Sequence, residues 1–98
     1  MIGISVIHVG YKVPNGKLIE IDFEITEDKK FKNVQISGDF FLEPPEFLDI
    51  INNKLNGLPI SSNELDIKYV IEKSIDENVE MFGFSPVDIA IAIKRAII

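Results

Sequence analysis

The sequence contains no cysteine, no tryptophan and a single histidine among its 98 residues. The lack of thiols excludes disulfides, thiolate zinc sites, iron–sulfur ligation and a thiol nucleophile. The single histidine, His8, excludes a metal site built from several imidazoles. Because it alternates with apolar residues in a strand-like segment, we expect it at the solvated surface. The side chains that most often carry enzyme chemistry are therefore scarce.

Basic residues are also few, with 10 Lys and Arg against 16 Asp and Glu, which gives a net charge of −6. Nucleic-acid binding needs clustered basic residues that neutralise phosphates, so we expect no nucleic-acid partner. The sequence has no run of about 18 apolar residues, which excludes a membrane-spanning helix. Residues 1–5 form neither a charged leader nor a cleavage site, so we expect a cytoplasmic protein.

The composition is typical of one small folded domain. It is 46% hydrophobic and 27% charged, which distinguishes it from disordered chains. A chain of this length buries roughly 60–65% of its unfolded surface on folding. No repeat, low-complexity tract or linker divides it, so we expect residues 1–98 to form a single domain.

The N-terminal part shows the two-residue period of β-strands. The clearest segment is 17–25, where Ile and Phe alternate with acidic residues. This pattern predicts a strand with one face on a core and the other in water. Two further strands are expected, at 7–13 and at 32–37. Ile4 and Val6 have the opposite parity, which predicts a bulge or fray near Val6.

Short polar segments connect these three predicted strands. Pro14-Asn15-Gly16 joins the first two, and Asn-Gly favours a hairpin because both residues tolerate positive φ. Glu27-Asp28-Lys29-Lys30 joins the second and third. We therefore expect an antiparallel meander.

The remaining residues show helical spacing. One helix is expected between Pro45, which suits a first turn, and Gly57, which ends a helix. A second follows the segment Ser61–Glu64, which has the spacing of a capping box. A third begins with Ser85 as N-cap and Pro86 at the first helical position. The apolar residues assigned to the second helix are Leu65, Val70, Ile71 and Ile75. The predicted fold class is α+β, a three-stranded antiparallel meander backed by about three helices.

The last predicted helix is apolar almost all round, through residues 89–93. A helix on the surface needs only one apolar stripe, so this helix is either central to the core or covered by a second molecule. Its exposed side, with Ile89 and Ile93, is therefore one candidate for partner contact.

The segment Gly38-Asp39-Phe40-Phe41 is the most informative part of the sequence. A strand alternates its side chains, so Phe40 and Phe41 cannot both face one core if the strand continues through them. Either the chain turns here and both rings pack internally, or one ring faces a second surface. The second arrangement makes residues 38–44, including Glu43 and Pro44, candidates for partner binding.

Other polar residues allow only weak functional hypotheses. Asp39, Glu43 and Glu46 are close in sequence, and paired carboxylates can act in acid–base catalysis or bind a hard cation. Acidic residues are also favoured at a helix start by the helix dipole, without any function. Asn15-Gly16-Lys17 lacks the spacing of a phosphate-binding loop and is expected to be a turn. We expect no complete active site, no bound cofactor and no bound metal in this chain alone.

A set of ordered motifs resembles the C-terminal accessory domain of lipoate–protein ligases. The motifs are Gly16-Lys17-Leu18, Gly38-Asp39-Phe40-Phe41 with Glu43-Pro44, Leu55-Asn56-Gly57-Leu58, and Gly83-Phe84-Ser85-Pro86 with Asp88. The resemblance extends from about Val9 to Ala96. Asn15 departs from the pattern, because the family commonly has a second glycine there, although Asn also accepts positive φ.

The resemblance implies an α+β accessory unit beside a separate catalytic domain, which holds the catalytic lysine and the pockets for ATP and lipoate. In some archaea the two are separate polypeptides, and this chain is similar to that small subunit. The implied activity of the complex is ATP- and Mg-dependent formation of lipoyl-AMP, followed by transfer to a lysine of a lipoyl carrier domain. The implied partner is the catalytic large subunit, and the accessory unit serves mainly the first step.

Two other functional classes stay open on the sequence alone. One is a stand-alone interaction module with an unrelated partner. The other is a small enzyme or metal-binding protein built on Asp39, Glu43 and Glu46.

Overall fold

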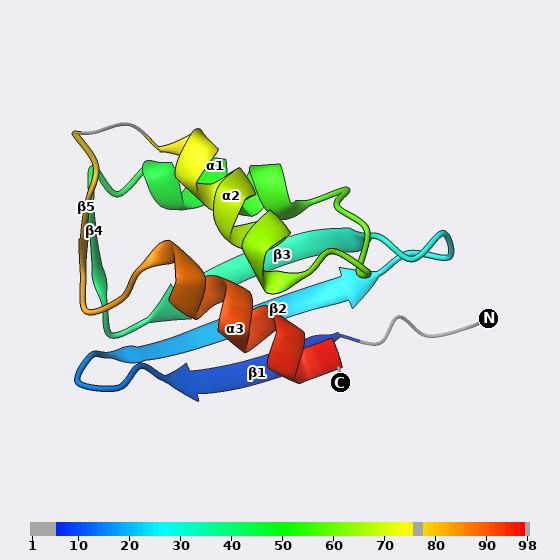
Figure 1. Ribbon diagram of the computed structural model, residues 1–98, viewed down its shortest axis with the longest axis horizontal. Helices are drawn as coiled ribbons and strands as arrows, with labels where there is room; N and C mark the ends of the chain where they lie inside the picture. The colour runs from blue at the N-terminus through cyan, green and yellow to red at the C-terminus, as the bar shows by residue number, and fades with distance from the viewer. Residues whose placement is uncertain (1–5, 76–77, 98) are drawn as a thin grey trace.

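The alternating segment forms β2 (Leu18–Ile25), the central strand of a three-stranded antiparallel sheet in the computed structural model (Figure 1). The structure describes residues 6–75 and 78–97. β2 pairs with β1 (Ile7–Lys12) and with β3 (Phe31–Gly38). Its apolar residues face the core, and the exposed fractions of Ile19, Ile21 and Phe23 are 0%, 0% and 1%. The predicted meander is confirmed.

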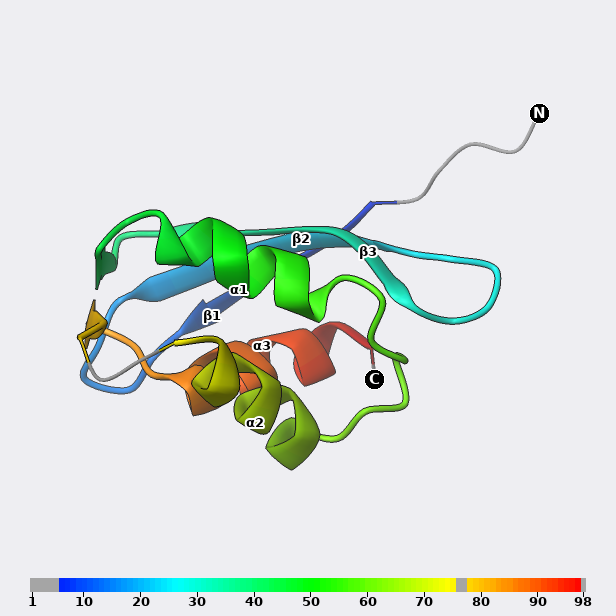
Figure 2. The same cartoon turned by 90° about the horizontal axis from the view of Figure 1, so that it is seen from above.

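Three helices cover one face of this sheet (Figure 2). α1 (Phe47–Leu55) packs on β3, whereas α3 (Pro86–Ile97) packs on β1 and β2. The backbone of α2 (Glu64–Ser74) lies close to α1 and α3 but not to any of the strands. The molecule therefore has a sheet, a layer of two helices and an outer helix, which confirms the predicted α+β class.

The apolar character of α3 is explained by its central position. Ile89, Ala90, Ala92 and Ile93 are buried, because one side of α3 faces the sheet and another faces α2. At the C-terminal end of α3 the Arg95 guanidinium lies 4.8 Å from the centre of the Tyr11 ring. The sequence left two explanations for this helix, a central position in the core or cover by a second molecule. The structure shows the central position.

A bulge in β3 was not expected from the sequence. Asp22 pairs with Gln35 and Glu24 with Lys32, so two residues of β3 lie opposite one residue of β2. Asn33 adopts a positive φ of 53° there, and the extra residue returns Phe31 and Val34 to the same buried face.

The first connecting turn and the start of β1 lie close to where the sequence places them. At the turn, the Gly16 N–H donates to the Val13 carbonyl at 2.8 Å. Both turn residues tolerate a positive φ, and Asn15 adopts one, 60°. β1 begins at Ile7 after an exposed Val6. Ile4, which contributed to the expected bulge or fray, lies outside the described residues.

The capping residue of α2 differs from the prediction. The helix begins at Glu64, and the Asp66 N–H donates to the Asn63 side chain at 2.8 Å. The Asn63 N–H donates in turn to the Asp66 carboxylate, at 3.3 Å. The capping box is therefore Asn63–Asp66 rather than Ser61–Glu64.

The shifted start of α2 changes which of its residues form the core. Ile67 and Ile71 are fully buried, whereas Leu65, which was assigned to the apolar face, is 71% exposed. The apolar face of the helix is therefore defined by Ile67 and Ile71.

The other helix ends lie near the sequence signals, although α1 begins at Phe47, two residues after Pro45. α1 ends before Gly57, which has a φ of 90°. α3 begins at Pro86, and both the N–H and the hydroxyl of Ser85 donate to the Asp88 carboxylate at 2.8 Å. The hydroxyl therefore acts through Asp88 at this helix start.

Truncation of Phe23 will destabilise the fold. Its ring is buried and packs edge-on against Phe31 with ring centres 5.1 Å apart. We expect Phe23→Ala to lower the free energy of unfolding by about 3–4 kcal/mol, measured by urea denaturation. Phe41→Ala is the matched control, because that ring is 71% exposed. Equal unfolding midpoints for the two variants would contradict the assignment of the core.

The capping box of α2 gives a second prediction. Asn63→Ala removes the side-chain acceptor of the Asp66 N–H and is expected to cost roughly 1 kcal/mol, measured by thermal unfolding. Ser61→Ala is the control and should change stability little. A larger loss from Ser61→Ala than from Asn63→Ala would restore the capping box expected from the sequence.

Candidate functional site

The chain reverses sharply at Gly38, where β3 ends. Gly38 has a φ of 146°, and a Cβ atom there would lie 2.1 Å from the Leu18 carbonyl oxygen. The next residue, Asp39, donates its N–H to that carbonyl at 3.2 Å. Only glycine fits this position, because any side chain would collide with backbone. The turn takes the two phenylalanines that follow out of the line of β3.

Phe40 and Phe41 lie in different environments as a result of this turn. Phe40 is half-buried and packs on Phe84, with ring centres 4.1 Å apart. Phe41 is 71% exposed. The structure therefore combines parts of the two arrangements considered from the sequence. The chain turns here and Phe40 packs internally, as in the first, but Phe41 faces solvent, as in the second.

Phe41 belongs to a two-stranded antiparallel sheet that we call the aromatic ribbon. It comprises β4 (Phe41–Glu43) and β5 (Glu80–Phe82). In register the pairs are Phe41 with Phe82, Leu42 with Met81, and Glu43 with Glu80. Strands of three residues are too short for a period-two signal, which is why the sequence did not predict them.

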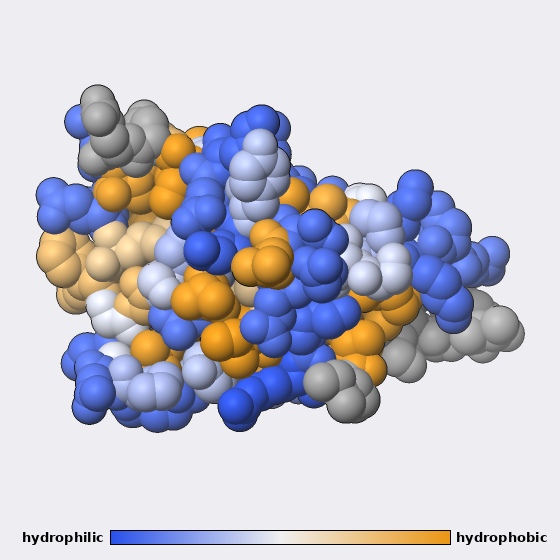
Figure 3. All heavy atoms as spheres, viewed as in Figure 1, coloured by the Kyte–Doolittle hydropathy of each residue, from blue (hydrophilic) through white to orange (hydrophobic). Residues whose placement is uncertain are grey.

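The two faces of the aromatic ribbon differ in character. Leu42 is 6% exposed and belongs to the core, and Met81 packs against the same core. Phe41 and Phe82 are on the opposite face and are 71% and 51% exposed. Apolar surface gathers at the end of the molecule where Figure 1 places β4 and β5 (Figure 3). Phe82 is the functional candidate that the sequence did not reveal.

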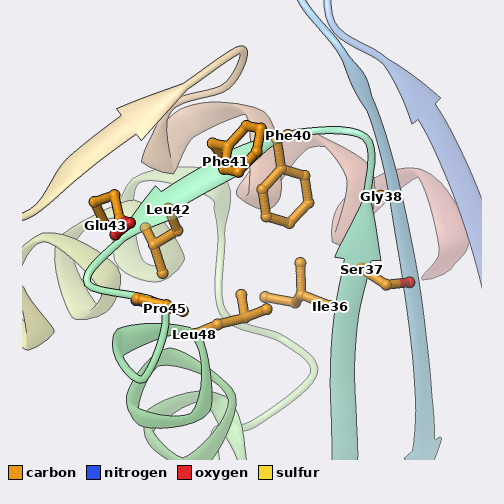
Figure 4. A pocket seen from close by; sticks show the side chains of 9 residues that line it. All are labelled: Ile36, Ser37, Gly38, Phe40, Phe41, Leu42, Glu43, Pro45 and Leu48. Atoms are coloured by element: carbon orange, nitrogen blue, oxygen red, sulfur yellow. The ribbon is translucent and has the colours of Figure 1, made fainter.

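An apolar groove of about 350 Å³ adjoins the aromatic ribbon, between the end of β3, β4 and the start of α1. Ile36, Phe40, Leu42 and Leu48 point toward one another across it, whereas Ser37 and Glu43 point away (Figure 4). The groove is lined by Ile36, Ser37, Gly38, Phe40, Phe41, Leu42, Glu43, Pro45 and Leu48. Its polar side chains are a serine and a glutamate, and none of these lining residues is basic.

Backbone contacts between distant segments hold the aromatic ribbon against the sheet. The Lys17 N–H donates to the Gly83 carbonyl at 2.9 Å, which ties the first hairpin to the segment after β5. A Cβ at Gly16 would lie 2.5 Å from the same carbonyl oxygen, and Gly83 has a φ of 89°. Three of the motifs noted in the sequence thus meet at one end of the molecule.

The remaining residues proposed from the sequence lie in three different settings. Pro44, which follows β4, is half-buried, whereas Asp39 is exposed at the turn. Ile89 and Ile93 are 0% and 1% exposed. These two isoleucines therefore belong to the core of this fold and offer no surface to a partner.

The acidic residues near the aromatic ribbon do not form a metal centre in the part of the chain that the structure describes. No group of three or more His, Asp or Glu side chains there is arranged to hold a metal ion. Asp39, Glu43 and Glu46 thus have no geometry there that supports the metal-binding alternative. Among the helices within 6–75 and 78–97, none has the length and apolar character needed to cross a membrane.

Comparisons with known proteins bear on the fold. A solved structure of an archaeal lipoylation system, a bi-partite lipoate protein ligase and its E2 lipoyl domain from Thermoplasma acidophilum, contains a chain of similar fold. The TM-score is 0.73 at 23% sequence identity, and the match covers 93% of this chain and 97% of that one. The two chains therefore share their fold over nearly their whole lengths. No protein-family model and no curated protein matches the sequence.

The sheet face opposite the helices carries the one histidine. His8 Nδ1 lies 2.5 Å from Asp22 Oδ1, and His8 Nε2 lies 3.5 Å from Glu20 Oε1. The hydrogen bond with Asp22 raises the pKa of His8 above its ordinary value, and the negative charges of Asp22 and Glu20 add to this effect. The histidine is exposed, as expected, and it has a structural ion pair rather than a catalytic arrangement.

The pKa of His8 gives a prediction with a defined sign. Because the pKa is raised in the folded state, its contribution to stability is fully present below the unfolded pKa of about 6.5. This contribution is lost as pH rises through the folded value. We expect an NMR titration of the His8 ring to show a pKa above 6.5 and Asp22→Asn to lower it. An unchanged titration in Asp22→Asn would contradict the assigned cause.

Proposed function

We propose that this chain is the accessory subunit of a two-part lipoate–protein ligase. In this role it is needed for the ATP-dependent conversion of lipoate to lipoyl-AMP by a separate catalytic subunit. The observation that carries the proposal is the fold likeness to a chain of the bi-partite ligase and lipoyl-domain system, at a TM-score of 0.73. The motifs from Gly16 to Asp88, which resemble the accessory domain of these ligases, support the same assignment.

The chemistry of the chain favours a non-catalytic role. Adenylation places a carboxylate against the α-phosphate of ATP, and cationic groups stabilise the charge that develops there. This chain has a net charge of −6, and the lining of its apolar groove includes no basic residue. Direct contact with the phosphates of magnesium-bound ATP would be unfavourable here. The proposal therefore assigns ATP, magnesium and lipoate to the catalytic subunit.

A subunit without catalytic groups can still control the reaction. Formation of an acyl-adenylate needs an active site that excludes water, because water would hydrolyse the intermediate. A partner that binds the closed form of the active-site loops more tightly than the open form shifts the population toward it. To change a closed form from about 1% to about 99%, the partner must bind it roughly 10⁴-fold more tightly. A protein–protein interface of ordinary size can supply this difference.

The second step depends less on such a subunit. Once lipoyl-AMP exists, transfer to a lysine of a lipoyl carrier domain needs the carrier to approach the bound adenylate. This chain meets the carrier only indirectly in the proposed mechanism, through its heterodimer with the catalytic subunit.

Reconstitution tests the proposal. Purified chain, catalytic subunit, ATP, magnesium and lipoate are combined, and pyrophosphate release is followed with each protein omitted in turn. We expect neither protein alone to release pyrophosphate at an appreciable rate and the mixture to be at least tenfold faster. Transfer from preformed lipoyl-AMP to the carrier serves as the internal control and should change much less.

Three results would contradict this function. The first is lipoate adenylation by the isolated chain. The second is a catalytic subunit that is fully active without it. The third is the appearance of a lipoyl group on a lysine of this chain, detected by mass spectrometry, which would make it an acceptor instead of a subunit.

A further inference from the structure

The solvent face of the aromatic ribbon combines two features that are each unfavourable in water. At about 200 Å² of surface per phenylalanine, the exposed fractions of 71% and 51% leave roughly 240 Å² of Phe41 and Phe82 uncovered. Monomeric proteins rarely expose contiguous apolar patches larger than a few hundred Å², and the adjoining apolar groove enlarges this one. Next to the rings, Glu43 and Glu80 lie directly opposite each other in register, and like charges in such a pair repel.

The glutamates of the aromatic ribbon have no counter-charge in the described part of the chain. The ion pairs found among residues 6–75 and 78–97 involve His8, Lys30 and Lys68 and leave Glu43 and Glu80 unpaired. Lys17 lies beside Gly83, which follows the phenylalanine end of the ribbon. A cation placed between the two glutamates would remove their repulsion.

The apolar groove limits the chemistry of what can bind beside the ribbon. Its lining is mostly aliphatic and aromatic, and Glu43 is its one charged residue. A free carboxylic acid or a phosphate would meet no cation among these lining residues. An apolar side chain next to a lysine or arginine would meet favourable partners on both sides, because the groove is apolar and the adjoining glutamates are negative.

We propose that the aromatic ribbon and the apolar groove form the surface that docks a segment of the catalytic subunit. This inference rests on the proposed function. The segment places an apolar side chain in the groove and a basic side chain, best an arginine, between Glu43 and Glu80. A guanidinium can bind both carboxylates and also stack on the exposed phenylalanine rings.

A second copy of this chain is a poorer occupant. Two identical aromatic ribbons would bring four glutamates together, two from each copy, without a compensating cation on either ribbon. Charge complementarity therefore favours a basic partner over self-association.

Binding to the catalytic subunit, measured by isothermal titration calorimetry, tests the proposed surface. Phe82→Ala and Phe41→Ala should each weaken binding about 30-fold, the loss typical of an aromatic residue at the centre of an interface. The matched control is Leu65→Ala, since Leu65 on α2 is also 71% exposed. It should stay within twofold of the unchanged protein. Circular dichroism checks that every variant is folded.

A charge variant keeps the test valid even if an aromatic truncation disturbs the ribbon. Glu80→Lys removes one carboxylate and adds a cation, and it should weaken binding about tenfold, mainly through slower association. The difference from the unchanged protein should shrink as salt is raised from low ionic strength, because salt screens exposed charges. Glu72→Lys on α2 is the control, because that exposed glutamate lies outside the surface.

The possible results distinguish an error in the proposed docking surface from an error in the proposed function. If the unchanged chain activates the catalytic subunit while the Phe41, Phe82 and Glu80 variants bind as tightly as it does, the surface is wrong and the function stands. If the unchanged chain neither binds nor activates, the proposed function itself fails. If light scattering shows a dimer of this chain that Phe82→Ala dissociates, a second copy is the occupant and the proposal is overturned.

Discussion

The arrangement of this molecule depends on close approach of backbone to backbone at one end of the sheet. Gly38 leaves no room for a Cβ beside the Leu18 carbonyl, and Gly16 leaves none beside the Gly83 carbonyl. The Asp39 and Lys17 N–H groups form hydrogen bonds to those same two carbonyls. These contacts place the two-stranded β4–β5 sheet at the end of the larger sheet and turn Phe41 toward solvent while Phe40 packs on Phe84. The glycines therefore determine that Phe41, and not Phe40, is exposed to solvent.

The fold class could be predicted from the sequence where local pattern and tertiary packing agree. The alternation around Phe23 and the turn at Asn15 are of this kind, because a strand with one wet face and a tight turn have local signals. The bulge at Asn33 could not be predicted, since it is stabilised by the Asn56 side chain, which accepts the Val34 N–H from 22 residues further along the chain. The cap of α2 was misassigned because Ser61 and Asn63 are both capping residue types, and the packing of Ile67 and Ile71 decides between them.

For a similar reason, the sequence indicated only part of the candidate site. Two adjacent phenylalanines showed that something unusual occurs at residues 40 and 41, but not which ring is exposed. Phe82 gave no signal, because its importance comes only from its register opposite Phe41. Ile89 and Ile93 were candidates because a helix that is apolar all round can face either a core or a partner, and only the position of α2 distinguishes the two. The exposed face of the aromatic ribbon is built from two short strands that are far apart in sequence. Only the tertiary structure can therefore show it.

The outer position of α2 has a consequence for how the molecule opens. Because the backbone of α2 lies close to α1 and α3 but not to any strand, α2 can detach without breaking a hydrogen bond between β1, β2 and β3. Such sub-global opening costs less than complete unfolding, so amide protons in α2 should exchange with solvent sooner than those of the central strand. The sheet, together with α1 and α3, would then behave as one cooperative unit and α2 as another. A domain of 98 residues would in this way have two levels of local stability.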